Sequence, residues 1–431
     1  MINKRKIVVQ FNEANFKLLS KYLDKYDLPN LKEIVTNFSL INTSSEKDYK
    51  NLEPWIQWYS FYVNKDFNSH KTFHLGDCLK MSHQTFTEEL VNNGVQVGFF
   101  GSMNLKPNPK YKIFIPDAWT EAESDNSLSS KVVWKSMRKI IDKNARLKLG
   151  LSDIFGLLFL IGIPKNLYDI LSCFQALKSF LTRSRSELAS LFDYFFLNYS
   201  LKRIKKNNID FSMVFLNGLA HVQHHYLLNS EFVEGKNPSW YSKNNDDFLN
   251  SLKIYDRAFK KILSMRKSYE IWFITGLTQE ACKNPVIYWR IRNIQDLMHN
   301  YFNFKINVHK RMTRDFEVEV KNRNNINKVI HFLENAKIIN EKGSKENSKK
   351  AFGFINKVSD NSVFASFVYS GSEKDVMLIY NDVTLQMKKN IDFVAIKNGN
   401  HNQEGWAFCS SKIDYQKSNI PIWDLSKLIT T

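Results

Sequence analysis

The sequence predicts an α/β fold, a three-layer α/β/α sandwich with a mostly parallel central sheet. Short apolar runs of strand composition alternate with segments of helical spacing through the first hundred residues. The runs are apolar throughout, which is typical of parallel strands covered by helices on both faces. The chain has 431 residues, 43% hydrophobic and 24% charged, enough for a large core with insertions.

The elements follow in βαβ order. Proline suits a first helical turn, so the dipeptide Glu53-Pro54 marks the start of a helix. Asn93-Gly94 is a fitting C-terminal signal for another. We predict helices over residues 16–26, 31–37, 85–93 and 248–265, one more from Glu53-Pro54, and core strands over residues 7–11, 38–43, 95–101, 211–216 and 271–274.

Two stretches interrupt this rhythm. Residues 121–205 show helical spacing almost throughout and predict an all-α insertion. Residues 302–393 contain a strictly alternating run, Phe-Glu-Val-Glu-Val, and a polar loop, which predict a small α+β cap. The chain therefore divides into a first core part, a helical insertion, a second core part, a cap and a last core part, at residues 1–120, 121–205, 206–301, 302–393 and 394–431.

The formal net charge is +18, but it is spread thinly along the chain. Short basic clusters at residues 4–6 and 203–206 are not accompanied by any nucleic-acid-binding motif, so a nucleic-acid partner is not expected. An abundance of Lys and Asn, as in an AT-rich genome, explains the charge. A diffuse attraction to anionic glycans, phosphates or a membrane surface stays open as the alternative.

The cysteines and apolar segments bear on the compartment. Four single, widely spaced cysteines argue against a zinc–cysteine site and a disulfide scaffold. A strand begins at Ile7 with no preceding apolar region, so we predict no signal peptide. Residues 149–164 are apolar but too short and interrupted to span a bilayer, and predict a buried or membrane-touching helix. We expect a cytoplasmic protein, with peripheral membrane contact left open.

Polar residues after the predicted strands indicate where ligands bind. Glu13 follows the first strand, His221 follows the strand at 211–216, and His401 follows a strand ending near residue 396. Carboxyl ends of parallel strands meet at one edge of a sheet, so these three side chains should converge there. A lone histidine is usually structural, but two strand ends with histidine beside Glu13 favour a site. Imidazole and carboxylate groups suit zinc or a similar ion, or acid–base catalysis.

The order of these features resembles the alkaline phosphatase superfamily, specifically its type I phosphodiesterase and nucleotide pyrophosphatase branch. The resemblance is carried by Glu13, the Leu-Pro-Asn-Leu segment at 28–31, a nucleophile segment at 52–60, an Asp-x-x-x-His pair matched by Asn217 and His221, and the final His401. It covers about two-thirds of the chain. It implies a divalent metal ion, zinc or similar, held by Glu13, Asn217, His221 and His401.

Three departures from the family pattern limit what the resemblance implies. Asn217 stands in place of an aspartate, and Thr275-Gly276-Leu277 stands where the family has an Asp-His pair for a second metal. No Ser or Thr occupies the nucleophile position, where Glu53 lies nearest. A single-metal or metal-free site remains, with Glu13 and Glu53 as catalytic carboxylates. Glu53 could equally be an acid favoured by a helix N-terminus.

Substrate contacts are predicted at two places. Arg290 offers a bidentate fork for phosphate, sulfate or carboxylate, and the adjacent Trp289 suits stacking on a sugar or base. The alternative is that Trp289 packs in the core. His224 and His225 are neighbours on a predicted helix and point about 100° apart, so only one should reach the site, and we assign His225 to substrate binding.

Together these features predict a hydrolase of phosphodiesterase, phosphatase or sulfatase type, or a related transferase. The predicted substrate is an anionic sugar or nucleotide sugar, and the resemblance suggests surface-polysaccharide metabolism as the setting. The rival interpretation is a catalytically inactive descendant of the fold that binds a glycan or a protein partner. The missing Asp-His pair and the missing Ser/Thr nucleophile motivate that rival.

Overall fold

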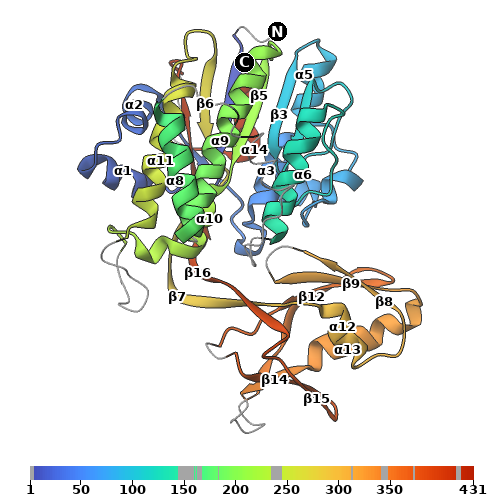
Figure 1. Cartoon of the computed structure of the whole chain (residues 1–431). Coiled ribbons are helices and arrows are strands. Elements are labelled where there is room, and N and C mark those ends of the chain that lie inside the picture. The colour runs from blue at the N-terminus through green and yellow to red at the C-terminus, as the bar shows by residue number, and fades with distance from the viewer. Residues whose placement is uncertain are drawn as a thin grey trace. The chain divides into compact units, whose positions relative to one another are not determined.

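The structure is a computed structural model that describes residues 4–143, 160, 162, 167–182, 184–233, 245–311, 314–340, 348–371, 374–413 and 419–431 (Figure 1). The chain folds into two compact units. The first comprises Met1–Lys283 and Asn398–Thr431, and the second comprises Asn284–Lys397.

An eight-stranded sheet forms the centre of the first unit. One strand, β17, runs antiparallel to both of its neighbours, and the remaining pairings are parallel. The prediction of a mostly parallel sheet is therefore confirmed. The strand order across the sheet is β18 (Ile420–Pro421), β2 (Ser39–Ser44), β17 (Glu404–Cys409), β6 (Glu270–Ile274), β1 (Lys6–Phe11), β5 (Phe211–Leu216), β3 (Val97–Ser102) and β4 (Ile113–Pro116).

Helices cover both faces of this sheet, which confirms the three-layer sandwich (Figure 1). Successive side chains of a strand point to opposite faces, so Ile7 and Val9 of β1 belong to one core layer and Val8 to the other. The first layer contains α1 (Phe16–Lys25), α2 (Pro29–Asn37), α9 (Arg185–Lys206) and α11 (Asp247–Leu263). The second contains α3 (Pro54–Val63), α5 (Phe86–Asn92) and α14 (Ile422–Thr430), with the short α4 (Phe67–His70) beside α3.

The described part of the predicted helical insertion packs against the core. Its described helices are α6 (Leu128–Lys143), α8 (Leu167–Thr182) and α9. Helix α9 packs against α11 and β5, and its residues Leu191 and Phe196 are buried in the first core layer. The apolar segment at 149–164 lies almost entirely outside the described residues. No helix in the described part of the chain has the length and apolarity needed to cross a membrane.

Asp117 is a buried carboxyl group just beyond the end of β4. Its Oδ1 accepts a hydrogen bond from the backbone N–H of Thr120 at 2.9 Å, and its Oδ2 has no hydrogen-bond partner among the described residues. Burial raises the pKa of Asp117 to about 7, because the charged form loses its hydration. The folded state therefore holds this proton more tightly than the unfolded chain does.

The raised pKa of Asp117 predicts a loss of stability as pH increases. Below the unfolded value of about 4 both states are protonated, and stability falls as pH rises towards about 7. We expect Asp117→Asn to raise the free energy of unfolding on the order of 2–4 kcal/mol at pH 8 and to leave it nearly unchanged at pH 4. Urea denaturation at both pH values measures this, with the exposed Asp24→Asn as control. Equal effects of Asp117→Asn at pH 4 and pH 8 would contradict it.

The second unit is an α+β fold with its own core. Its residues Phe316, Val318 and Val320 are buried on one face of β9, as the alternating pattern predicts. One sheet has the order β12 (Phe352–Ser359), β13 (Ser362–Phe367), β9 (Asp315–Val320) and β8 (Ile306–Lys310). The other has the order β11 (Lys349–Lys350), β10 (Lys337–Asn340), β14 (Val376–Tyr380) and β15 (Val383–Gln386), and the helices are α12 (Ile294–His299) and α13 (Ile326–Asn335).

The chain passes between the units in two long strands. Strand β7 (Thr278–Ile291) pairs with β16 (Ile391–Asn402) in a two-stranded sheet. The second unit consequently begins at Asn284, inside β7, whereas the predicted cap begins at residue 302. The difference arises because β7 continues without a break through a stretch that carries no alternating pattern.

Candidate metal centre

The centre of the site is a tight turn directly after β1. Glu13 is buried, with 2% of its surface exposed, and its backbone φ is +57°. A non-glycine residue in this left-handed region is uncommon, and such strain is found mainly where surrounding contacts enforce it, often at functional sites. The neighbouring Asn12 donates from Nδ2 to Glu13 Oε1 at 2.9 Å.

Contacts from both faces of the sheet hold this turn in place. Trp58 of α3 donates its indole N–H to Asn12 Oδ1 at 2.8 Å, and Trp406 of β17 donates its own to the Ala14 carbonyl at 2.9 Å. Gln223 donates to the backbone carbonyl of Glu13 at 2.7 Å. These bonds fix the direction of the Glu13 carboxylate.

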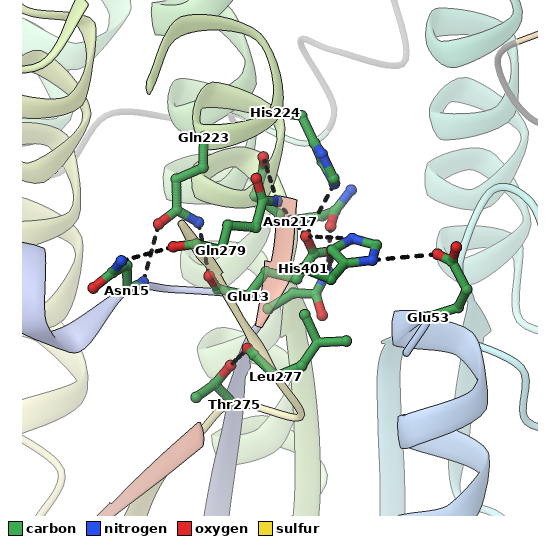
Figure 2. Close-up of polar contacts among 12 residues, drawn as sticks. Glu13, Asn15, Glu53, Asn217, Gln223, His224, Thr275, Leu277, Gln279 and His401 are labelled. Carbon is green, nitrogen blue, oxygen red and sulfur yellow. Dashed lines mark hydrogen bonds and ion pairs between the residues drawn. The ribbon is translucent and has the colours of Figure 1, made fainter. Parts of the chain in front are cut away.

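Two imidazoles meet the Glu13 carboxylate at one oxygen (Figure 2). His224 of α10 (Gly218–Tyr226) places Nε2 3.0 Å from Glu13 Oε2, and His401 of β16 places Nε2 3.3 Å from the same atom. Gln279 of β7 donates its amide to that oxygen as well. Burial alone would raise the pKa of Glu13, but His224 and His401 outweigh it and hold the pKa well below its usual range.

His401 reaches the site because β17 runs against the other strands. The antiparallel β17 starts at the edge where the parallel strands end, with Glu404 opposite Ser44 at the end of β2. His401 precedes β17 and therefore lies at that edge. Gly399 allows β16 to approach closely, because a Cβ there would lie 2.2 Å from Gln279 Oε1.

Glu53 contacts His401 from the other side. It is the N-cap residue of α3, and its Oε2 lies 3.5 Å from His401 Nδ1, with 34% of the side chain exposed (Figure 2). A carboxylate next to the second nitrogen of a metal-binding imidazole fixes the ring orientation and increases its basicity. His401 thus has a carboxylate at each ring nitrogen.

The three groups form a donor set that fits a divalent cation. Glu13, His224 and His401 each offer one ligand atom, and these atoms all lie within 4.8 Å of one another. One carboxylate and two imidazoles are a known ligand set for catalytic zinc, in which a fourth position stays open for water or substrate. The amides of Asn12 and Gln279 contact the same carboxylate and would orient it.

The structure brings Glu13, Glu53 and His401 together but replaces His221 with His224. His221 lies one turn earlier on α10, and its ring packs against that of His225 with centroids 4.7 Å apart. The run of three histidines within five residues marks this helix in the sequence but does not single out His224. Which histidine reaches Glu13 depends on how α10 is seated at the strand edge.

Two more predicted residues lie outside the donor set. Asn217 ends the loop after β5, and its Oδ1 accepts a hydrogen bond from Asn12 Nδ2 at 2.8 Å, so it contacts the amide that orients Glu13. It is one contact removed from the cluster. His225 offers its backbone carbonyl to Asn398 Nδ2 at 2.8 Å, and its role in substrate binding stays a prediction.

Trp289 is a core residue of the second unit, which corrects its predicted stacking role. Only 6% of it is exposed, its Nε1 donates to the Gly371 carbonyl at 2.8 Å, and its ring lies against Tyr369 and Phe393. The indole is therefore held within the fold. Arg290 follows it on β7 and is partly buried, and its contact with an anion stays a prediction.

The turn after β6, at Thr275-Gly276-Leu277, offers no carboxylate or imidazole side chain. Thr275 is buried and donates its hydroxyl to the Leu277 carbonyl, while Ser45 donates to the Gly276 carbonyl. The first bond closes the turn on itself, and the second attaches it to the residue that follows β2. Residues 275–277 therefore lack the side chains for a second metal, and their backbone is held in a turn by hydrogen bonds.

Ser60 cannot serve as a substitute nucleophile in this arrangement. It is buried in α3, and its hydroxyl donates to the Ile56 carbonyl at 3.0 Å. The Thr72 backbone N–H donates to His70 Nδ1 at 3.0 Å, so His70 carries its proton on Nε2, 2.9 Å from Ser60 Oγ. The histidine donates to the serine and is not positioned to accept its proton.

Asp193 of α9 caps the helix that carries His224. It is buried and accepts from the Gly218 backbone N–H at 2.7 Å and from the Tyr255 hydroxyl at 2.5 Å. The N-cap residue of α10 makes no side-chain capping bond of its own. Gly218 permits this approach, since a Cβ there would lie 2.6 Å from the Ala189 carbonyl oxygen.

We expect Asp193→Ala to lower the affinity for a divalent cation about 10-fold or more, because α10 loses its cap and His224 its fixed position. Asp256→Ala is the matched control. Asp256 is also buried and caps α2 through the backbone N–H groups of Asn30 and Leu31. Both variants should lose about 1–2 kcal/mol of stability, but only the first should bind metal more weakly in a calorimetric titration. Equal metal affinity in both would exclude a positioning role for Asp193.

Comparison with known proteins gives structural matches alone. No protein-family model and no curated protein matches the sequence. Matching solved structures are members of the alkaline phosphatase superfamily.

One is a phosphonoacetate hydrolase from Sinorhizobium meliloti 1021 in complex with phosphonoacetate, with 12% identity and a TM-score of 0.43 over 100% of this chain and 95% of that one. Another is human ectonucleotide pyrophosphatase/phosphodiesterase 5, with 10% identity and a TM-score of 0.42 over 99% and 94%. A third is the alkaline phosphatase PafA, with 11% identity and a TM-score of 0.47 over 99% and 95%. At these identities and scores, the function of this chain has to be argued from its own side chains.

Proposed function

We propose that the protein is a single-metal hydrolase of phosphate- or sulfate-type esters. The observation that carries the proposal is the cluster of Glu13, His224 and His401, whose ligand atoms lie within 4.8 Å of one another at the carboxyl edge of the sheet. A divalent cation bound there would act as a Lewis acid and lower the barrier to ester hydrolysis. The net charge of +18 is compatible with an anionic substrate, but it is spread thinly along the chain and does not single one out.

Within this proposal the residues of the chain have distinct tasks. Glu13 stays ionised, because its pKa is held low by His224 and His401, and it supplies the negative charge of the donor set. Glu53 is part-exposed and borders His401, so it can orient that ring and exchange a proton with solvent or substrate. Its predicted use as a replacement nucleophile remains a hypothesis, as does the choice of an anionic sugar or nucleotide sugar as substrate.

Metal analysis combined with turnover tests this function. The purified protein should contain close to one equivalent of zinc or a similar ion and should release nitrophenol from a bis-aryl phosphodiester, an aryl phosphate or an aryl sulfate. Chelation should stop the release and added metal should restore it. Glu53→Gln should lower the rate by about 100-fold, the size of effect typical of a lost acid–base group. Bound metal with no turnover of any of the three esters would overturn the hydrolase assignment.

A non-catalytic binding protein is the second candidate. It is favoured by the closed turn at residues 275–277, where Thr275 and Ser45 occupy the backbone carbonyls of Leu277 and Gly276. The start of α3 also favours this candidate, because its N-cap Glu53 and the following Pro54 and Trp55 offer no hydroxyl nucleophile. In that case the donor set would still bind metal, and the metal-loaded protein would retain an anionic glycan without hydrolysing it.

A further inference from the structure

The second unit contains a hollow unrelated to the donor set. It has a volume of about 490 Å³, within the range of small-ligand sites, and every residue that lines it belongs to the second unit. Its walls come from three places: the segment after α12, the exposed face of α13, and the turn between β14 and β15. It therefore does not depend on the placement of the first unit.

Aromatic rings form much of the lining. Phe302 and Phe304 lie with ring centroids 5.0 Å apart, and Tyr301 and Tyr380 meet nearly edge-on at 5.9 Å. All four are partly buried and pack against the core of the second unit. Their positions are thus set by the fold. Because the rings are already ordered, the protein loses little conformational entropy when a ligand stacks on them.

Polar groups surround these rings. Asn303, Asn327 and Asn381 line the hollow and are exposed, so their amides can both donate and accept hydrogen bonds there. Lys328 is exposed beside Asn327 on α13 and adds a positive charge. His331, one turn along, is held by a 2.8 Å hydrogen bond between its Nδ1 and the Tyr380 hydroxyl.

We propose that this hollow binds an acidic saccharide. Sugars carry apolar C–H faces that stack on aromatic rings, and hydroxyl groups that pair with amides. Lys328 selects saccharides with a carboxylate, sulfate or phosphate over neutral ones. A purely apolar ligand would make no use of the three asparagine amides or of Lys328, whereas a saccharide can bond to them. The second unit then serves as a saccharide-binding module, whether or not the first unit is a hydrolase.

Retention of defined oligosaccharides by the full-length protein tests this proposal. The probes are an array of neutral, uronic-acid and sulfated oligosaccharides, together with oligodeoxythymidylate as an anionic, stacking non-saccharide. We expect acidic saccharides to be retained over neutral ones, in the presence and absence of a chelator. The variant Asn327→Ala/Lys328→Ala should weaken their binding at least 10-fold.

The matched control is Lys321→Ala/Arg323→Ala, which removes two exposed basic residues of the same unit outside the hollow. It should bind as the wild type does. The proposal is overturned if no acidic saccharide is retained, if the control loses as much binding as the Asn327/Lys328 variant, or if oligodeoxythymidylate binds in preference. Because both variants change exposed residues, thermal unfolding should confirm that each is folded.

Discussion

Replacing His224 with alanine is expected to abolish metal binding, with a loss of affinity greater than about 100-fold, whereas His221→Ala is expected to keep it. His224 Nε2 lies 3.0 Å from Glu13 Oε2 and completes the donor set, while His221 packs against His225. Losing a residue that merely supports a ligand already costs 10–100-fold in affinity, so losing the ligand itself should cost more. Metal content after purification and competitive titration with a chromophoric chelator measure both variants.

This pair of variants distinguishes two predictions, one based on the family resemblance and one based on the structure. The resemblance implies a ligand role for His221, whereas in the structure it is His224 that lies in the candidate donor set. Because the two residues lie one turn apart on the same helix, their replacement should perturb α10 to a similar degree. Loss of metal in His221→Ala with retention in His224→Ala would show that the site uses the family position after all.

Glu13→Gln is expected to destabilise the metal-free protein by about 3–5 kcal/mol, as in other cases where one partner of a buried charged cluster is removed. Glu13 Oε1 accepts from Asn12, and Oε2 faces Gln279 and two imidazole nitrogens. The glutamine amide has only one acceptor oxygen. Its NH2 group would therefore face the donating amide of Asn12 in one orientation and that of Gln279 in the other. Chelator-treated protein should show this loss in urea denaturation.

Glu53→Gln is the control for that experiment. Glu53 touches the same His401, but 34% of its side chain is exposed, so water can replace its contacts and the change should stay below about 1 kcal/mol. If both variants lost equal stability, or if Glu13→Gln lost less than the control, the Glu13 carboxylate would not be the centre of this network.

The sequence predicts the first unit well because its signals are local. The predicted strand at 211–216 coincides with β5, and most predicted helices differ from the observed ones by one or two residues. Buried parallel strands are apolar along their whole length, and helix starts such as Glu53-Pro54 carry their own signals. Glu13 follows β1 as expected, whereas His401 lies within β16, beyond the strand end predicted near residue 396, and its Nε2 is 3.3 Å from Glu13 Oε2.

What the sequence leaves open depends on contacts between distant segments. The antiparallel direction of β17, which places His401, is set by pairing with β2 and β6. Gln279 reaches Glu13 across 266 positions in the chain, and no local pattern marks it. The choice between His221 and His224 depends on how α10 is seated by Asp193, and the burial of Trp289 depends on Tyr369 and Phe393.

The two indoles that hold the turn at Glu13 have an optical consequence. Trp58 and Trp406 are buried on opposite sides of the sheet, and each donates its N–H to a residue next to Glu13. Indole emission responds to hydrogen bonding and nearby charge, so a cation arriving at the carboxylate should change the fluorescence of both. Because Trp58→Phe and Trp406→Phe each remove one emitter, the difference spectra can follow metal occupancy in real time, without an added dye.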